Sequence, residues 1–382
     1  MLTKLRIKNF KSFKNDTIID FTKTNYKILS DTNTYNDVLK GGIFVGANAS
    51  GKTNAIKAIS KLLELLFAEK MMFLDNDKCL FSNETNILLE YHFKINTSNI
   101  KYTIEYDCKE KSITLEKLYL NNQLILNRIG ENGESEITEN KIFKEVDNNS
   151  LLLREIYFNT KFRGHDILKD WFDFLLNSIF LNAYHRTVFT TGQKILDFKE
   201  YVKSNGVDFI NEFFNELEFD QNIEYANKCK GKLTEIIYGS NEEKSIFFKR
   251  KGVGEPIPYP MESLGNQNLL NILPSFFHTI KNSGMLIIDG FSNGFHNKLE
   301  ELLIRYFMKN SKQSQIFIVT HSTNLLTHSL LRPDQIFTTT FNGSNGSFIK
   351  RASEERPREA QNLEKMYLGG VFGGLPIYND EE

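Results

Sequence analysis

Cysteine and proline are scarce in this sequence, with 3 and 7 residues in a chain of 382. The cysteines, Cys79, Cys108 and Cys229, are isolated, and no CxxC pair occurs. A disulfide framework or a structural zinc site needs paired or clustered cysteines. Neither is expected here.

Net charge and long apolar runs are also lacking. Lys plus Arg (47) almost balance Asp plus Glu (48), which leaves a formal charge of -1. A basic coat for nucleic acid over the whole chain is therefore absent, although a local patch stays open. No stretch approaches the roughly 18 apolar residues of a membrane span, and the opening MLTKLRIKNFKSF lacks the apolar core of a signal peptide. We expect a soluble, cytoplasmic protein without a membrane partner.

Hydrophobic residues make up 40% and charged residues 25%, which is typical of globular proteins. The chain of 382 residues is long enough for two domains or for one domain with an insertion. Alternation predicts strands within residues 2–21 and hairpins over 87–126. Helical spacing predicts helices over 54–67, from Ile167 to Phe180 and around 209–217. Apolar strands at 285–288 and 315–320 flank a helix, which indicates a parallel sheet covered by helices.

A glycine-rich loop stands between an apolar strand and an amphipathic helix. Its residues, Gly46, Ala47, Asn48, Ala49, Ser50, Gly51, Lys52 and Thr53, fit the GxxxxGK[ST] pattern. Glycines let such a loop curl, so that backbone N–H groups and the helix N-terminus face phosphate oxygens. Lys52 can reach the β- and γ-phosphates, and the Thr53 hydroxyl can ligate Mg²⁺. The pattern predicts a site for ATP with Mg²⁺.

An acidic strand end supports the same chemistry. Met285–Asp289 reads as a buried strand that ends in a carboxylate, which suits the hydration shell of Mg²⁺. The next position is Gly290, which has no proton acceptor and cannot act as a general base. The sequence leaves open whether hydrolysis is slow, uses another residue or has been lost from an active parent. If everything else is intact, Gly290→Glu is expected to restore turnover.

Ser263, Gly265 and His321 complete the candidate set. Ser263 and Gly265 precede an apolar helix, whose N-terminus is an anion site, but Ser263 alone reads more simply as an N-cap. His321 follows an apolar strand and could bond the γ-phosphate, although a lone histidine is more often structural.

The order of these motifs resembles the ABC-type ATPase heads of the SMC, RecF and OLD group. The opening LTKLRIKNFKSF with GANASGKTNAIKAI, and IDGFSNGFHNKLEELLIRYF, are similar to the two halves of such heads. The C-terminal YLGGVFGGLPIY is most similar to ATP-binding subunits of bacterial abortive-infection systems of the AbiL and PARIS type. The resemblance covers roughly residues 1–95 and 230–378. It departs at Gly290, and residues 80–95 contain no obvious glutamine loop.

The resemblance implies a P-loop ABC-type α/β head with a mixed sheet, an antiparallel β subdomain and a helical insertion. Residues 1–150 and 230–382 would form the two halves of the head, and 151–229 the insertion. By this resemblance, the phosphates would be bound by Gly46, Asn48, Gly51 and Lys52. Mg²⁺ would be held directly by Thr53 and, through water, by Asp289. Ser263 and Gly265 would contact the nucleotide of a second copy, and His321 the γ-phosphate.

The implied function is an ATP-dependent dimerising ATPase that senses phage and controls a toxic effector encoded nearby, such as a TOPRIM-type nuclease. The alternative is a RecF- or SMC-like DNA-repair ATPase, which predicts a basic stripe on Lys4, Arg6, Lys8, Lys11 and Lys14 or on Lys244, Lys249, Arg250 and Lys251. A third class, a nucleotide-locked structural protein, follows from Gly290.

The C-terminal segment Tyr367–Tyr378 is apolar and has two possible roles. It could pack on the chain's own head, or it could contribute to an interface in which Phe372 is the anchor.

Overall fold

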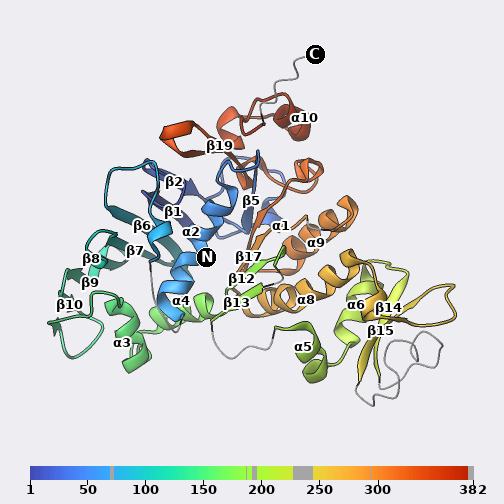
Figure 1. Ribbon diagram of the computed structural model, residues 1–382, viewed down its shortest axis with the longest axis horizontal. Coiled ribbons are helices and arrows are strands. Elements are labelled where there is room, and N and C mark those ends of the chain that lie inside the picture. Colours follow the sequence, from blue (N-terminus) through green and yellow to red (C-terminus); the bar gives the residue numbers. More distant parts are fainter. Residues whose placement is uncertain (69–72, 186, 192–195, 227–243, 293, 377–382) are drawn as a thin grey trace.

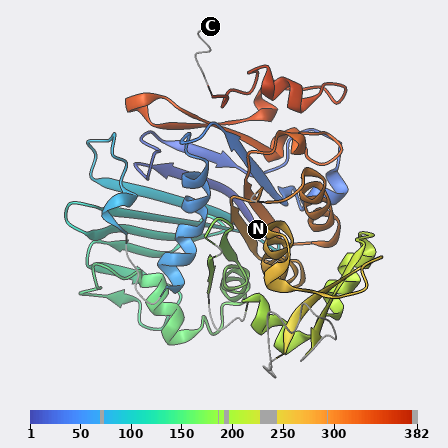
Figure 2. The ribbon, with the colours of Figure 1, turned by 45° about the vertical axis from the view of Figure 1, so that its right-hand side comes forward.

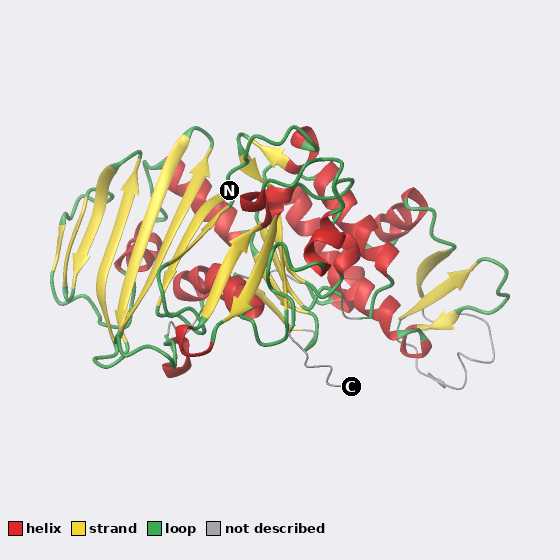
Figure 3. Ribbon diagram, turned by 90° about the horizontal axis from the view of Figure 1, so that it is seen from above, coloured by secondary structure: helices red, strands yellow, loops and turns green. Residues whose placement is uncertain are grey.

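Two large sheets dominate the computed structural model, which describes residues 1–68, 73–185, 187–191, 196–226, 244–292 and 294–376. An eight-stranded sheet forms one end of the molecule, and a seven-stranded sheet lies at its centre (Figures 1 and 3). A small three-stranded sheet with short helices lies at the opposite end (Figure 2). Among the described residues, no helix is both long enough and apolar enough to span a membrane.

The eight-stranded sheet is antiparallel and contains the hairpins that the alternation predicts. In spatial order its strands are β11 (Ile142–Phe143), β10 (Asn132–Ser135), β9 (Gln123–Ile129), β8 (Ser112–Leu120), β7 (Ser98–Asp107), β6 (Asn86–Ile95), β1 (Leu2–Lys8) and β2 (Thr17–Asp20). Every second residue of β6 is buried. One face of the sheet therefore packs on the core, as period-two patterning requires.

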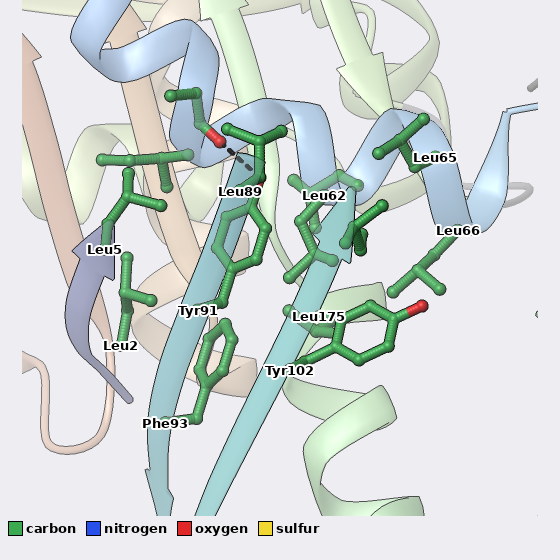
Figure 4. Close-up of a cluster of buried hydrophobic side chains, with 14 of the residues drawn as sticks. Leu2, Leu5, Leu62, Leu65, Leu66, Leu89, Tyr91, Phe93, Tyr102 and Leu175 are labelled. Carbon is green, nitrogen blue, oxygen red and sulfur yellow. Dashed lines mark hydrogen bonds between the residues drawn. The ribbon is translucent and has the colours of Figure 1, made fainter. Parts of the chain in front are cut away.

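Helix α2 (Lys52–Phe67) packs against that buried face. Figure 4 shows Leu62, Leu65 and Leu66 of α2 above Tyr91 and Tyr102 of the sheet. Helices α3 (Leu152–Thr160) and α4 (Asp166–Leu176) extend the same core, to which the central sheet also contributes. The helix that begins with the phosphate loop is thus held between the two sheets.

A buried carboxylate anchors α3 to the eight-stranded sheet. Glu116 accepts hydrogen bonds from the backbone N–H groups of Leu152 and Leu153 (2.8 and 2.9 Å) and from the Tyr102 hydroxyl (2.7 Å). Its neighbour Arg128 is equally buried and donates to three backbone carbonyls. Burial raises the pKa of Glu116 although these donors oppose the shift. The carboxylate supplies the partners that a helix N-terminus otherwise lacks.

The central sheet is mixed, as the resemblance implies. Its order is β13 (Thr187–Thr190), β12 (Ile179–Asn182), β17 (Met285–Asp289), β18 (Gln315–Val319), β5 (Gly41–Gly46), β19 (Ile336–Phe341) and β20 (Ser347–Arg351). The strands from β12 to β19 run parallel, and β13 and β20 are antiparallel edges. Helices α8 (Leu264–Asn282) and α9 (Asn297–Asn310) share a second core with the sheet. The parallel strands therefore end at one edge of the sheet, where the candidate motifs collect.

The remaining elements are short. The small sheet comprises β14 (Gln221–Ala226), β15 (Ser245–Arg250) and β16 (Ile257–Pro258), and α5 (Phe198–Asn205) and α6 (Asp208–Glu216) lie beside it. The others are α1 (Ser30–Asn33), β3 (Thr34–Tyr35), β4 (Val38–Leu39), α10 (Leu363–Leu368) and the 3-10 turns η1 (Asp75–Asp77), η2 (Tyr259–Met261), η3 (Thr323–Leu325), η4 (Pro333–Gln335), η5 (Gly343–Asn345) and η6 (Ala352–Glu355).

The helix predicted from Ile167 to Phe180 is wrong at its C-terminal end. α4 ends at Leu176, and the apolar residues that follow form β12, buried beside β17. A strand covered on both faces is continuously apolar, so periodicity alone cannot separate it from a buried helix. The range 151–229, expected to be a helical insertion, therefore contributes β12 and β13 to the central sheet. The boundary at 150 stays a prediction, and the one at 229 lies outside the described residues.

Candidate nucleotide-binding site

The phosphate loop joins the end of β5 to α2, and its backbone depends on glycine. φ is 154° at Gly46 and 109° at Gly51, a region that side chains rarely adopt. A Cβ on Gly51 would lie 2.3 Å from the Ser347 hydroxyl oxygen, and one on Gly46 would lie 2.5 Å from the Thr339 carbonyl oxygen. The loop therefore packs so closely on β19 and β20 that both positions must be glycine.

The middle of the loop has one open and one buried side. Asn48 and Ala49 are exposed, and Ala49 has φ of 61°. Ser50 is buried, and its hydroxyl lies 2.5 Å from that of Thr339. The Ser50 side chain thus fixes the loop to the sheet, and its backbone N–H donates to the Ala47 carbonyl at 3.3 Å, which tightens the turn of the loop.

Lys52 is buried at the first turn of α2. Its ammonium group donates to the carbonyls of Gly46 (2.9 Å) and Ala47 (2.7 Å), which closes the loop across itself. Burial lowers the pKa of Lys52, and the charge of Asp289 opposes that shift. The cation therefore lies where phosphate oxygens at the loop would meet it.

Thr53 and Asp289 meet at the end of β17. Thr53 Oγ1 donates to Asp289 Oδ1 at 3.0 Å, and Asp289 is buried. Burial raises the pKa of Asp289 against the effects of Thr53, Lys57, Lys52 and His185. A hydroxyl and a carboxylate oxygen are the ligands that Mg²⁺ takes in proteins, so this pair fits the metal that accompanies a nucleotide.

His321 follows β18 and joins the same cluster. Burial and the charge of Lys52 lower the pKa of His321, while Asp289 raises it. A neutral imidazole close to both groups can donate one hydrogen bond to a phosphate oxygen. The loop, Thr53, Asp289 and His321 therefore lie together at one edge of the sheet, although they are far apart in the sequence.

Ser263 and Gly265 lie apart from this cluster, at the N-terminus of α8. Ser263 Oγ accepts from the Asn266 N–H at 3.3 Å, as an N-cap does, and Ser263 is exposed. A Cβ on Gly265 would lie 2.4 Å from the Gly294 carbonyl oxygen, so α8 approaches the turn after β17 too closely for any side chain. Among the described residues, neither Ser263 nor Gly265 is hydrogen-bonded to the phosphate loop of its own chain.

Three parts of the site were not predicted from the sequence: Tyr184, His185 and the C-terminal segment. The turn after β12 brings Tyr184 against Gly290 and His185 near Asp289. Residues 86–95 form β6 of the eight-stranded sheet, whereas Phe81, before that strand, packs against Phe341 at the end of β19, with ring centroids 5.3 Å apart. The C-terminal segment is the third, because the Ala47 N–H donates to the Gly374 carbonyl at 2.7 Å. Within the described residues, no cluster of three or more His, Cys, Asp or Glu side chains could hold a metal ion on its own.

The central sheet, the phosphate loop and the acidic strand end define a P-loop ATPase with the ABC-type head fold. Residues 43–327, more than half of the chain, match the family described as "AAA domain, putative AbiEii toxin, Type IV TA system". The chain belongs to this family.

Individual relatives are more distant. A Helicobacter pylori protein described as an ATP/GTP phosphatase is 24% identical over 354 residues, 85% of this chain and 86% of that protein. The SMC head domain from Thermotoga maritima superposes with a TM-score of 0.51 at 17% identity, covering 91% of this chain and 97% of that one. An Smc head bound to the C-winged helix domain of ScpA superposes with a TM-score of 0.51 at 15% identity, covering 91% of this chain and 96% of that one. These structures confirm the SMC-like fold, while the similarity to AbiL and PARIS subunits stays a prediction.

Proposed function

We propose that this chain binds ATP with Mg²⁺, dimerises around the nucleotide and hydrolyses it slowly, and that this cycle controls a toxic partner in antiviral defence. The contact between Thr53 and Asp289 carries the proposal, because it joins the end of the phosphate loop to the acidic strand beside Lys52 and His321. The Helicobacter pylori relative described as an ATP/GTP phosphatase supports a nucleotide as ligand.

Each group has a definite task. Lys52 and the loop N–H groups bind the phosphates, and His321 donates to the terminal phosphate. Thr53 and Asp289 would hold Mg²⁺, whose charge offsets that of the phosphates. Gly290 offers no carboxylate, and a missing general base typically costs about 10²–10⁴-fold in rate. Slow turnover prolongs the nucleotide-bound state, which suits a sensor better than a metabolic enzyme.

Dimerisation is proposed from the exposed N-terminus of α8. Ser263 and Gly265 present a helix N-terminus that, in the described part of the chain, is not hydrogen-bonded to the chain's own phosphate loop, so a second copy could place its nucleotide there. The description of the family as a toxin of a type IV toxin–antitoxin system supports an effector, for which we propose a nuclease of the TOPRIM kind.

DNA repair is the alternative, and ion pairing weakens it. Arg6, Lys8 and Lys11 pair with Asp16, Glu84 and Asp77, each at 2.7 Å. The second candidate stripe is similar, since Lys249 pairs with Glu224 and Arg250 with Glu262. Paired acids reduce the local positive potential that binds phosphate backbones. A salt-dependent DNA-binding assay on the dimer separates the two functions.

The decisive experiment measures mass in solution, by light scattering after size exclusion, with and without ATP and Mg²⁺. The wild type should dimerise with ATP, and Ser263→Arg should remain monomeric while it binds ATP normally, because the bulky cation enters the contact between copies. Ser204→Arg, an exposed position in α5, is the matched control. Normal ATP-dependent dimerisation of Ser263→Arg would rule out the proposed interface.

A further inference from the structure

Position 290 is closed to side chains in this chain. Gly290 has φ of 78°, a conformation that L-residues rarely adopt. A Cβ built there would lie 2.2 Å from Cε2 and 2.5 Å from Cδ2 of Tyr184. Replacing glutamate by glycine at this position therefore does not leave an empty space, because the Tyr184 ring occupies the place of the missing side chain. Gly290→Glu by itself meets a clash, so the simple rescue expected from the sequence does not follow.

The fold delivers Tyr184 to this place. β12 runs parallel to β17 with Asn182 opposite Asp289, and the Ala183 N–H donates to the Asp289 carbonyl at 2.9 Å. The Asn182 side chain then accepts the His185 N–H at 3.0 Å, which closes the turn. Tyr184 is thus fixed beside Gly290 by backbone pairing on one side and by a side-chain hydrogen bond on the other.

The ring is packed but its outer part is accessible. Tyr184 is 53% exposed, and its phenol lies close enough to the Asp289 carboxylate to be affected by that charge. Burial and the charge of Asp289 raise the pKa of Tyr184, so the phenol stays neutral near pH 7. A neutral phenol donates one hydrogen bond and accepts another, which lets it hold a water molecule without removing a proton.

We propose that Tyr184 takes the place of the missing side chain at position 290: its ring holds the glycine turn, and its hydroxyl orients the attacking water. This inference rests on the proposed ATP hydrolysis. The water oxygen bonds to the γ-phosphorus as the bond to the bridging oxygen breaks. ADP leaves, and the water's proton passes to the phosphate product. Tyr184 is therefore a water-positioning residue, and the reaction proceeds without a protein base.

Glu300 is the competing candidate at this edge. It is 1% exposed on α9, and burial raises its pKa, although the hydroxyls of Ser322 and Ser292 oppose the shift. Its neighbours are these serines, on the side of α9, whereas Tyr184 lies directly against position 290. The variants Tyr184→Phe and Glu300→Gln therefore distinguish the two.

The test measures phosphate release over a range of ATP concentrations, with ATP affinity by calorimetry and melting temperature alongside. Tyr184→Phe keeps the ring and removes only the hydroxyl, so kcat should fall about tenfold, the effect of one hydrogen bond in the transition state, with KM and melting temperature unchanged. Tyr225→Phe in β14 controls for the loss of a hydroxyl elsewhere. Lys52→Ala sets the background rate.

A double substitution tests the volume argument. Gly290→Glu alone should lower the melting temperature and gain no turnover. Tyr184→Ala combined with Gly290→Glu opens the space, and it should release phosphate faster than either single variant. Fast turnover by Gly290→Glu alone, at an unchanged melting temperature, would overturn the inference.

The kinetic results also separate the inference from the function on which it rests. If the wild type exceeds Lys52→Ala but Tyr184→Phe matches the wild type, or if Glu300→Gln alone slows turnover, Tyr184 does not position the water and the proposed ATPase stands. If the wild type binds ATP but is no faster than Lys52→Ala, hydrolysis itself fails, and the role of Tyr184 fails with it.

Discussion

Thr53 donates a hydrogen bond to Asp289 across 236 positions of the sequence, with 3.0 Å between Thr53 Oγ1 and Asp289 Oδ1. The bond joins the first turn of α2 to the end of β17, two elements that the central sheet brings together. It places a hydroxyl and a carboxylate where a nucleotide's metal ion would lie. The pair should therefore make nucleotide affinity depend on Mg²⁺.

Thr53→Val tests that dependence, because valine keeps the shape of threonine and removes the oxygen ligand. We expect ATP affinity in the presence of Mg²⁺ to fall about tenfold or more, the effect of one lost contact to a charged group. Without Mg²⁺ the two proteins should bind alike. Calorimetry with Mg²⁺ and with a chelator measures both values, and Thr97→Val in the exposed β6–β7 turn is the control. An equal loss under both conditions would point to a damaged loop instead of a metal contact.

Lys52→Ala should weaken ATP binding by about 10- to 100-fold, because a hydrogen bond to a charged group contributes about 1.5–3 kcal/mol. The ammonium group also closes the loop through the carbonyls of Gly46 and Ala47, so some of the loss will come from the loop. The control is Lys309→Ala, an exposed lysine in the last turn of α9. Unchanged affinity in Lys52→Ala, measured by calorimetry, would exclude the loop as the site.

The sequence predicted the parts of this site whose chemistry is local. The phosphate loop, the strand ending at Asp289 and the position of His321 follow from short patterns, and the fold class followed from their order. Tyr184 could not be found in this way. The apolar run before it continues the pattern of α4, and only the pairing of β12 with β17 brings the turn to Gly290. The contact between Ala47 and Gly374 likewise joins two ends of the chain that carry no common pattern.

Asp77 should make the stability of the protein depend on pH in the acid range. Its buried carboxylate pairs with Lys11 and Lys61, each at 2.7 Å. Burial, the largest effect, would raise the pKa of Asp77, but Lys61, Lys11 and the Leu74 N–H together hold it below the usual value. A depressed pKa stabilises the folded state above the unfolded value of about 3.9, and this contribution is lost as the pH falls through the folded pKa.

Asp77→Asn should therefore be less stable than the wild type at pH 7, by about 1.5–3 kcal/mol, because the buried Lys61 keeps its ion pair with Glu64 (3.1 Å) but loses the shorter one with Asp77 (2.7 Å). The difference in melting temperature should shrink as the pH falls below about 4. Asp75→Asn is the matched control two residues away, since the Asp75 side chain is 84% exposed. A difference between wild type and Asp77→Asn that stays constant from pH 7 to pH 3 would contradict the ion-pair argument.

The C-terminal segment gives the last prediction, because its contacts favour packing on the chain's own head. Phe372 is fully buried in the second core, and its carbonyl accepts the Thr338 hydroxyl at 2.7 Å. Two residues later, the Gly374 carbonyl accepts the Ala47 N–H at 2.7 Å. The segment is thus hydrogen-bonded to the phosphate loop. The last two residues of the predicted segment Tyr367–Tyr378, and the chain after it, lie outside the described residues.

Phe372→Ala should lower stability by about 3–5 kcal/mol through the cavity it leaves. It should also weaken ATP binding, because the support of Ala47 loosens with it. Val371→Ala, at a side chain 42% exposed, should change neither quantity. Melting temperature with and without ATP measures both effects in one series, since a ligand stabilises the folded state according to its affinity. If Phe372→Ala instead keeps its melting temperature and ATP affinity but loses association with a second copy or an effector, the side chain serves an interface, and packing on the head is not its role.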